Sequence, residues 1–312
     1  MSKLMTSVSG VRGIFGETLN PIVALQYASH FGQFMAQESV NPASHHIPKI
    51  VVGRDSRTTG KAMLYAILSG LISTGCEVID LGIVPTPTVL LNVKKHSAQG
   101  GISITASHNP PQWNAMKFVD GDGMFLSPEK AFRFLDSIKE EIRWNNWQNI
   151  GTVTEDHEAI NYHIQRILNI PYLNIEKIRS NKFKIVLDSV NGAGGLASPL
   201  LLKALGCEVI EINSEPTGVF AHTPEPLNEN LHQLEENVKL HNAALGFATD
   251  PDVDRLAIVD ETGHCIGEEY SVALAELFIL PKKPGDIVVN LSSSMLSDYI
   301  AHKLVLKCIA PE

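Results

Sequence analysis

GCEVI, at residues 75–79, occurs a second time at residues 206–210. Each copy is preceded by a strand-like run, KIVV at 49–52 and KIVL at 184–187, then by a polar turn and an apolar helical segment. Short apolar strands that alternate with helices are typical of parallel sheets covered on both faces. The glycine that opens each copy stands where a helix C-cap glycine is expected. Chance repetition in valine-rich strands is the alternative, but the recurring strand and helix upstream argue against it.

A third copy of the plan begins near the end of the chain. It consists of a strand at 286–289, a serine turn at 292–294, a helix at 295–303 and a strand at 306–308. The sequence therefore predicts an α/β fold of repeated three-layer α/β/α domains with mixed, mainly parallel sheets. We expect two complete domains and the start of a third, bounded as 1–155, 156–258 and 259–312. In the first two copies we expect the helices at 62–72 and 199–204.

The composition limits the possible partners. The net charge is −9 with no basic block, which argues against a nucleic-acid surface but not against an anionic ligand. There is no signal-like start and no apolar run of 18 residues, so we expect a soluble cytoplasmic protein without membrane contact. No feature indicates an oligomeric state. Four cysteines without a CxxC spacing are expected to be reduced: Cys76, Cys207, Cys265 and Cys308.

The stretch DPDVDR at 250–255 carries three carboxylates at alternate positions. Carboxylates that converge on one side of a loop suit Mg²⁺ or Mn²⁺, which prefer oxygen ligands. A calcium-binding EF-hand is rejected, because Arg255 stands at the sixth position, where the sharp turn needs glycine. An acidic surface turn is the remaining alternative, although three close carboxylates repel one another without a cation.

The stretch TASHNP at 105–110 ends a β-rich run. Asn-Pro marks a loop, so we expect Ser107 at an exposed strand end. A Ser-His hydrolase is disfavoured, because adjacent residues do not easily form the nucleophile–base hydrogen bond and no GxSxG is present. Taken alone, the Ser-His pair is interpreted as a capping motif and Lys117 as a solvated lysine. Arg12, between two glycines, is a weak candidate for anion binding.

Together, these motifs resemble those of the α-D-phosphohexomutase family, in order and spacing over nearly the whole chain. The pairing of TASHNP with DPDVDR is highly specific. The resemblance also implies three similar α/β domains and a different fourth one. The matching motifs are SGVRG (9–13), VGRDSR (52–57), TASHNP (105–110), LDSVNGAGG (187–195), HTPEP (222–226) and DPDVDR (250–255).

The resemblance implies a role for each candidate residue. Ser107 would carry a phosphoryl group, and His108 and Asn109 would help to hold phosphate. One Mg²⁺ per chain would be bound by a phosphoserine oxygen and the three aspartates Asp250, Asp252 and Asp254. Arginine near neutral pH is a poor proton acceptor, so we assign proton transfer to Lys117 and electrostatic stabilisation to the arginines Arg12 and Arg255.

The implied reaction moves a phosphoryl group between the 1- and 6-positions of a hexose phosphate through a sugar bisphosphate. A non-catalytic sugar-phosphate binding module and a metal-dependent phosphatase are the alternatives. Ala115 departs from the family, which usually has glycine there; a left-handed backbone would cost alanine about 1 kcal/mol. The family's Gly-Glu-x-Ser-Gly-His sugar loop and fourth domain do not appear in this sequence, so we expect a truncated chain with weak turnover. We expect glucose or mannose phosphate rather than glucosamine phosphate.

Overall fold

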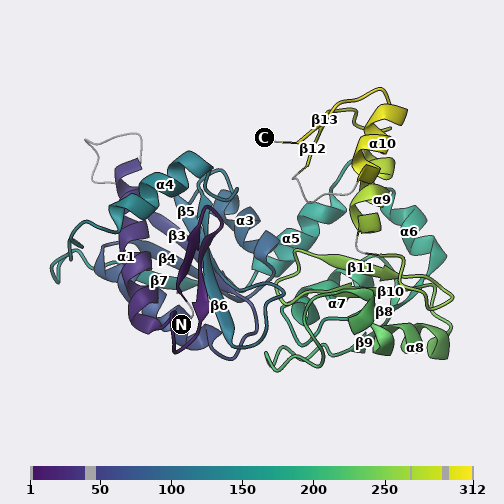
Figure 1. Ribbon diagram of the computed structural model, residues 1–312, viewed down its shortest axis with the longest axis horizontal. Coiled ribbons are helices and arrows are strands. Elements are labelled where there is room, and N and C mark those ends of the chain that lie inside the picture. The colour runs from purple at the N-terminus through teal and green to yellow at the C-terminus, as the bar shows by residue number, and fades with distance from the viewer. Residues whose placement is uncertain (1–2, 39–46, 268, 290–294, 311–312) are drawn as a thin grey trace.

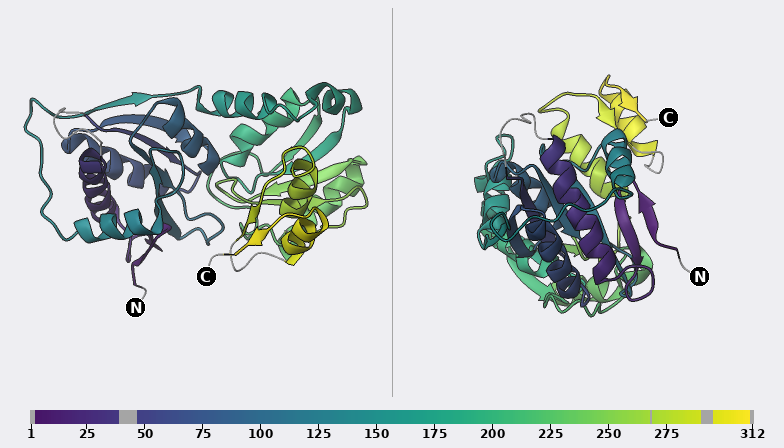
Figure 2. Two further views of the ribbon diagram at one scale, coloured as in Figure 1. Left: turned by 90° about the horizontal axis from the view of Figure 1, so that it is seen from above. Right: turned by 90° about the vertical axis from the view of Figure 1, so that its left-hand side faces the viewer.

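The computed structural model describes residues 3–38, 47–267, 269–289 and 295–310. Two sheets lie in separate lobes side by side, and the C-terminal segment lies beside the second lobe (Figures 1 and 2). Helices cover both sheets, and most strand pairs around the centre of each sheet are parallel. The predicted α/β fold class is confirmed, while the domain boundaries near residues 155 and 258 stay a prediction.

The first sheet has seven strands in the order β1-β2-β6-β5-β3-β4-β7. β3, β4, β5 and β7 run parallel, whereas β6 pairs antiparallel with both β2 and β5. β6 therefore lies next to β5, and β2 lies on the other side of β6. Both strands are near the end of β5, where the TASHNP loop begins. The strands are β1 Met5–Ser7, β2 Gly10–Ile14, β3 Lys49–Arg54, β4 Glu77–Ile83, β5 Gly100–Ile104, β6 Trp113–Asp120 and β7 Thr152–Glu155.

Helices cover both faces of this sheet. One face packs on α1 (Pro21–Glu38), α2 (Gly60–Ser73) and α4 (Pro128–Ser137), where Phe31 and Phe134 pack edge to face. The other face packs on α3 (Thr86–Lys95) and the first residue of α5 (Ala159–Leu168). α5 also contacts α7 of the second lobe, so it joins the two lobes.

The second sheet has four strands in the order β11-β10-β8-β9. Of its three strand pairings, β10-β8 and β8-β9 are parallel and β10-β11 is antiparallel. Leu202 of α7 packs on one face, and Leu234 and Val238 of α8 pack on the other. The elements are α6 Ile175–Asn181, β8 Lys184–Asp188, α7 Gly194–Ala204, β9 Glu208–Ile212, the short 3-10 helix η1 Asn228–Asn230, α8 His232–His241, β10 Leu245–Thr249 and β11 Leu256–Val259.

Helix α7 begins five residues before the predicted start, so Pro199 lies inside it rather than at its first turn. The helix starts at two glycines because the backbone there lies against neighbouring loops. A Cβ on Gly195 would lie 1.7 Å from the carbonyl oxygen of Ser214. The two C-cap glycines behave as predicted, with φ of +88° at Gly75 and +78° at Gly206.

The C-terminal segment contains α9 (Glu269–Ile279), α10 (Met295–Lys303) and a parallel pair of short strands, β12 (Ile287–Val288) and β13 (Cys308–Ile309). The predicted serine turn at 292–294 lies outside the described residues. The four cysteines are all unpaired. Within the ranges that the structure covers, no helix is long and apolar enough to cross a membrane.

Candidate active site

Ser107 lies just beyond the end of β5, and only 8% of its surface is exposed. Its Oγ donates a hydrogen bond of 2.6 Å to Oδ2 of Asp250 and lies 3.4 Å from Oδ1 of Asp254. The predicted exposed strand end is therefore wrong, because the aspartate loop of the second lobe covers the serine. The contact joins two residues that are 143 positions apart in the chain.

His108 is not paired with Ser107 as a general base would be. Its Nδ1 lies 3.4 Å from Ser107 Oγ, which is long for a hydrogen bond to a hydroxyl, and the shorter bond of the serine goes to Asp250. Nε2 lies 3.7 Å from a carboxylate oxygen of Glu225. Burial, followed by the charge of Arg255, lowers the pKa of His108. This geometry agrees with the rejection of a Ser-His hydrolase.

The three aspartates follow β10 and bring carboxylate oxygens within 4.8 Å of one another. Burial, and then the charges of Asp252 and Asp254, raise the pKa of Asp250 well above its usual value. Burial also acts to raise the pKa of Asp252, but Lys117 and the hydrogen bonds to the carboxylate outweigh it and the pKa is lowered.

Lys117 lies on β6 and reaches across to this cluster. Its Nζ donates to Oδ2 of Asp252 at 2.8 Å and to Oδ2 of Asp254 at 3.0 Å. Burial acts to lower the pKa of Lys117, but the two carboxylates outweigh it and the pKa is raised. The lysine is therefore a cation held between the two lobes.

The donor set fits a divalent cation. Asp250, Asp252 and Asp254 each offer a carboxylate oxygen, and the hydroxyl of Ser107 lies against the same group. Oδ1 of Asp252 is buried and lacks a hydrogen-bond partner among the described residues. A buried charged oxygen without a partner is costly unless a cation is bound, and an all-oxygen set of this kind suits Mg²⁺.

The two predicted arginines bind different partners near the serine loop. Arg12 on β2 donates from Nη1 to Oδ1 of Asn109 at 2.9 Å. Arg255 pairs with Glu225 at 3.1 Å, so the HTPEP segment lies beside the aspartate loop. The structure thus brings all nine candidate residues of the sequence analysis to one place between the lobes. Ala115 pairs with Arg12 inside β6 and is not among the residues of positive φ, so it carries no left-handed strain.

Three residues of this region had no predicted role: Thr86, which lies in none of the matching motifs, and Asp55 and Arg57, which lie in VGRDSR. Thr86 donates from Oγ1 to Oδ2 of Asp252 at 2.7 Å. Burial raises the pKa of Asp55 to about 6, against the charge of Arg57, whose side chain is also buried. The motif VGRDSR, which contains Asp55 and Arg57, lies far from Ser107 in the sequence. Only its match to a family motif could have pointed to these two residues.

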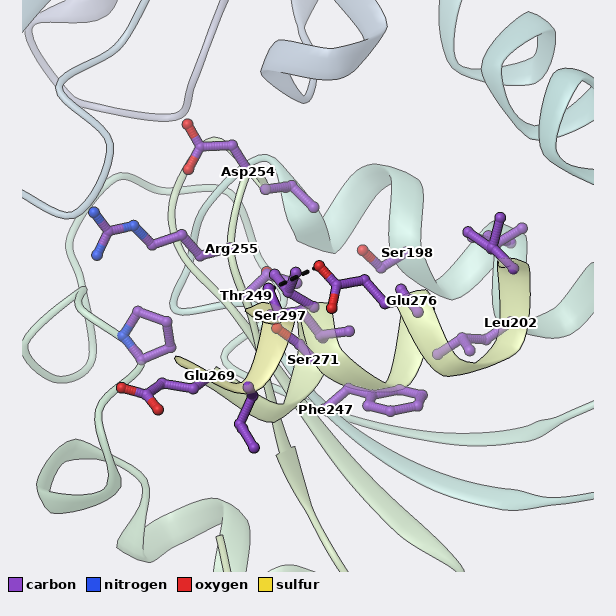
Figure 3. Close-up of a pocket in the computed structure, with 18 of the residues that line it drawn as sticks. Ser198, Leu202, Phe247, Thr249, Asp254, Arg255, Glu269, Ser271, Glu276 and Ser297 are labelled. Carbon is purple, nitrogen blue, oxygen red and sulfur yellow. Dashed lines mark hydrogen bonds between the residues drawn. The ribbon is translucent and has the colours of Figure 1, made fainter. Parts of the chain in front are cut away.

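A pocket of about 1120 Å³ lies between the second sheet, α7, α9 and α10. Figure 3 places Asp254 and Arg255 at one end of it and Leu202 at the other, with the pair Ser297–Glu276 between them. Most of the lining is apolar, in contrast to the charged group around Ser107. The pocket therefore meets the aspartate loop only at its edge.

His222 in the HTPEP segment gives a pH-dependent prediction. Its Nε2 lies 3.1 Å from Oδ2 of the buried Asp188, and its Nδ1 lies 2.8 Å from the carbonyl oxygen of Thr223. Both neighbours accept hydrogen bonds, which favours the doubly protonated ring. Burial acts to lower the pKa of His222, but Asp188 outweighs it and the pKa is raised.

A raised pKa contributes stability that is complete below the unfolded value of about 6.5 and is lost as the pH rises through the folded value. We expect the free energy of unfolding of the wild type to fall more steeply than that of His222→Gln as the pH rises above about 6.5. Urea denaturation at a series of pH values measures this. His157→Gln, at a largely exposed histidine, is the control. Parallel pH profiles for the wild type and His222→Gln would contradict the assignment.

Two family models match the chain in the lobes described above. Phosphoglucomutase/phosphomannomutase alpha/beta/alpha domain I matches residues 3–143, and domain II of the same family matches residues 161–263. The fold and the arrangement of the site define a protein of the α-D-phosphohexomutase class. The chain belongs to the phosphoglucomutase/phosphomannomutase family.

The similar curated proteins are longer than this chain. A probable phosphoglucosamine mutase of Methanopyrus kandleri is 37% identical over 298 residues, which are 95% of this chain and 63% of the relative. A phosphoglucomutase/phosphomannomutase of Thermococcus kodakarensis is 38% identical over 302 residues, which are 94% of this chain and 63% of the relative. The chain thus spans about 63% of the length of these relatives.

A crystal structure of a phosphoglucomutase/phosphomannomutase family protein from Burkholderia thailandensis has a TM-score of 0.78 and 27% sequence identity. The match covers 98% of this chain and 66% of that one. Several similar curated relatives are named probable phosphoglucosamine mutase. The expected preference for glucose or mannose phosphate over glucosamine phosphate therefore has no support.

Proposed function

We propose that this chain carries the phosphoserine and metal centre of a phosphohexomutase, which moves a phosphoryl group between the 1- and 6-positions of a hexose phosphate. The observation that carries the proposal is the contact between Ser107 Oγ and Asp250 across the two lobes. It places a hydroxyl that can carry a phosphoryl group against three carboxylates and the Lys117 cation. Membership of the family supports the same reading.

Asp250, Asp252 and Asp254, together with an oxygen of phosphorylated Ser107, would hold one Mg²⁺. Bound there, the ion would neutralise charge on the phosphoryl group as it transfers. Phosphoryl transfer depends mainly on positioning and on this neutralisation, so a site rich in fixed charges suits it. Arg12 and Arg255 both lie close enough to His108 to lower its pKa, and both would supply positive charge near the serine loop.

In the first transfer, the bond between Ser107 Oγ and phosphorus breaks and a bond from a sugar hydroxyl oxygen to phosphorus forms; the return transfer reverses these changes at the other phosphate. One proton must leave the sugar hydroxyl, and one must reach the serine oxygen. We assign this proton movement to Lys117: as a cation it donates a proton to the serine oxygen as the bond to phosphorus breaks, and once neutral it accepts the proton of the sugar hydroxyl. The resulting sugar bisphosphate turns over in the site and returns its other phosphoryl group to Ser107.

Incubation with glucose 1,6-bisphosphate and Mg²⁺, followed by intact-mass spectrometry, tests the proposal. We expect the chain to gain one phosphoryl group, and EDTA to prevent the gain. Steady release of free phosphate that survives Ser107→Ala would favour a metal-dependent phosphatase instead. Binding of a hexose phosphate without any gain of mass would favour a non-catalytic binding module.

Substitution of Lys117 by methionine is expected to slow the gain of the phosphoryl group by about 10²- to 10⁴-fold, the range typical of a lost proton-transfer group. The substitution also removes the cation that pairs with Asp252 and Asp254. We therefore expect the metal-free variant to unfold at a lower temperature than the wild type. Time-resolved mass spectrometry and thermal unfolding in EDTA measure the two effects.

Lys95→Met is the matched control. Lys95 is a partly buried lysine bonded to Asp156 at 2.6 Å, away from the serine loop. We expect its rate of phosphoryl gain to match that of the wild type. Equal rates for Lys117→Met and Lys95→Met would remove Lys117 from the proposed chemistry.

A further inference from the structure

Ser107 has a strained backbone. Its φ is +50°, in the left-handed region that residues other than glycine seldom adopt. Such a conformation is strained and persists only where the surroundings enforce it. This backbone conformation sets the direction in which the side chain leaves the chain, and Oγ points to Asp250. Whatever enforces it therefore aims the hydroxyl.

Both peptide groups of Ser107 are held by buried side chains. Its amide donates to Oγ1 of Thr105 at 2.9 Å. Its carbonyl oxygen accepts from Nη2 of Arg57 at 2.6 Å. Thr105 is completely buried, and Arg57 is 1% exposed, so water does not compete for either bond. The two contacts fix the peptide planes on either side of the strained residue.

The guanidinium of Arg57 binds mainly to this loop. A guanidinium has five N–H donors, and here five acceptors meet it at 2.6–3.1 Å. Four of them are backbone carbonyl oxygens of the serine loop and the start of β6. The acceptors are Oδ2 of Asp55 and the carbonyl oxygens of Ser107, Asn109, Pro110 and Trp113.

Asp55 ties the arginine to the threonine. Its carboxylate accepts from the amide and Nε of Arg57 at 2.9 and 3.1 Å and from Oγ1 of Thr105 at 2.7 Å. The Thr105 hydroxyl therefore donates to Asp55 while it accepts from Ser107. From the second lobe, the ring of Phe220 lies 5.1 Å from the guanidinium carbon of Arg57. The network is closed and has fixed hydrogen-bond directions.

We propose that Asp55, Arg57 and Thr105 form a positioning unit that holds Ser107 in its left-handed conformation and thereby aims its Oγ at the aspartate loop. None of these three residues is among those that would contact the transferring phosphoryl group, so they act through Ser107. Their catalytic effect rests on the proposed function, whereas their hold on the backbone does not. A lysine in place of Arg57 cannot reproduce five donors in one plane.

The threonine gives the sharpest test. Thr105→Val keeps the shape but removes the acceptor for the Ser107 amide, whereas Thr105→Ser keeps the hydroxyl. We expect Thr105→Val to slow phosphoryl gain from glucose 1,6-bisphosphate by about 10²-fold, the effect of a displacement of roughly 1 Å. Thr105→Ser should remain within about threefold of the wild type if the hydroxyl is what matters. Arg57→Lys should be impaired at least as much as Thr105→Val.

Amide hydrogen exchange of the peptide that contains Ser107 provides a readout that needs no activity. We expect faster exchange there in Thr105→Val and Arg57→Lys, and wild-type exchange in Thr105→Ser. Stabilisation by Mg²⁺ should be retained in Thr105→Val, since the aspartates lie on another loop. Thr88→Val, at an equally buried threonine bonded to His163, is the control and should change neither rate.

The proposal is overturned if Thr105→Val shows wild-type exchange around Ser107, or if Thr105→Ser is impaired as much as Thr105→Val. The second outcome would mean that packing, rather than the hydroxyl, is what matters. If the wild type gains no phosphoryl group, the proposed function fails. The exchange measurements on the same three variants then still decide whether the unit holds the backbone.

Discussion

Ser107→Ala is expected to gain no phosphoryl group when it is incubated with glucose 1,6-bisphosphate and Mg²⁺. The substitution removes the only atom of this residue that can form the bond to phosphorus, and loss of such a nucleophile lowers rates by on the order of 10³-fold or more. Intact-mass spectrometry over time, with the phosphorylated peptide located by fragmentation, measures the effect. Removal of the hydroxyl also ends its 2.6 Å bond to Asp250.

The matched control is Ser29→Ala. Ser29 is a completely buried serine of α1 whose Oγ donates to the carbonyl oxygen of Leu25, far from the aspartate loop. We expect this variant to gain the phosphoryl group at the wild-type rate. An undiminished gain in Ser107→Ala would show that another residue accepts the group, and the proposed chemistry would fall.

Asp250→Asn should stabilise the metal-free chain and weaken its stabilisation by Mg²⁺. Burial and the neighbouring carboxylates raise the pKa of Asp250, so its negative charge is unfavourable in the metal-free fold. A neutral amide removes that repulsion, and we expect the Tm in EDTA to rise by about 2 °C or more. In Mg²⁺, the same substitution removes one of the carboxylates that would hold the ion.

At a free Mg²⁺ concentration of 100 times Kd, binding stabilises the wild-type fold by about 2.7 kcal/mol. A tenfold loss of affinity in Asp250→Asn reduces this gain to about 1.4 kcal/mol. Thermal unfolding in EDTA and in Mg²⁺ therefore separates the two effects. Asp136→Asn, at an exposed carboxylate, should show the wild-type response. Equal Mg²⁺ stabilisation of Asp250→Asn and the wild type would exclude this carboxylate from the metal site.

The order of strands and helices could be predicted because it depends on local patterns. The apolar runs KIVV and KIVL became β3 and β8, and Gly75 and Gly206 ended helices with positive φ. The start of α7 could not be predicted, because it depends on how closely Gly195 approaches Ser214, a residue of another loop. Local propensity carries no information about such an approach.

The candidate residues of the site could also be named from the sequence, since three alternating aspartates and a Ser-His-Asn loop carry recognisable chemistry. The environment of these residues could not be predicted from the sequence. Ser107 is buried rather than exposed, and Lys117 is an ion-paired cation rather than a solvated lysine. Arg57 received no role, because four of its five acceptors lie 50 to 56 residues away in the chain.

Periodicity and residue chemistry act over a few positions, and they were enough to predict the α/β class, the repeated units and the types of side chain available for phosphate and metal. The contact between Ser107 and Asp250, and the bonds of Arg57 and Thr105 to the left-handed serine, became visible only in the folded chain. The physical reason is that the packing of two sheets and their helices fixes these distances, and the strain at Ser107 is sustained by buried hydrogen bonds from distant segments.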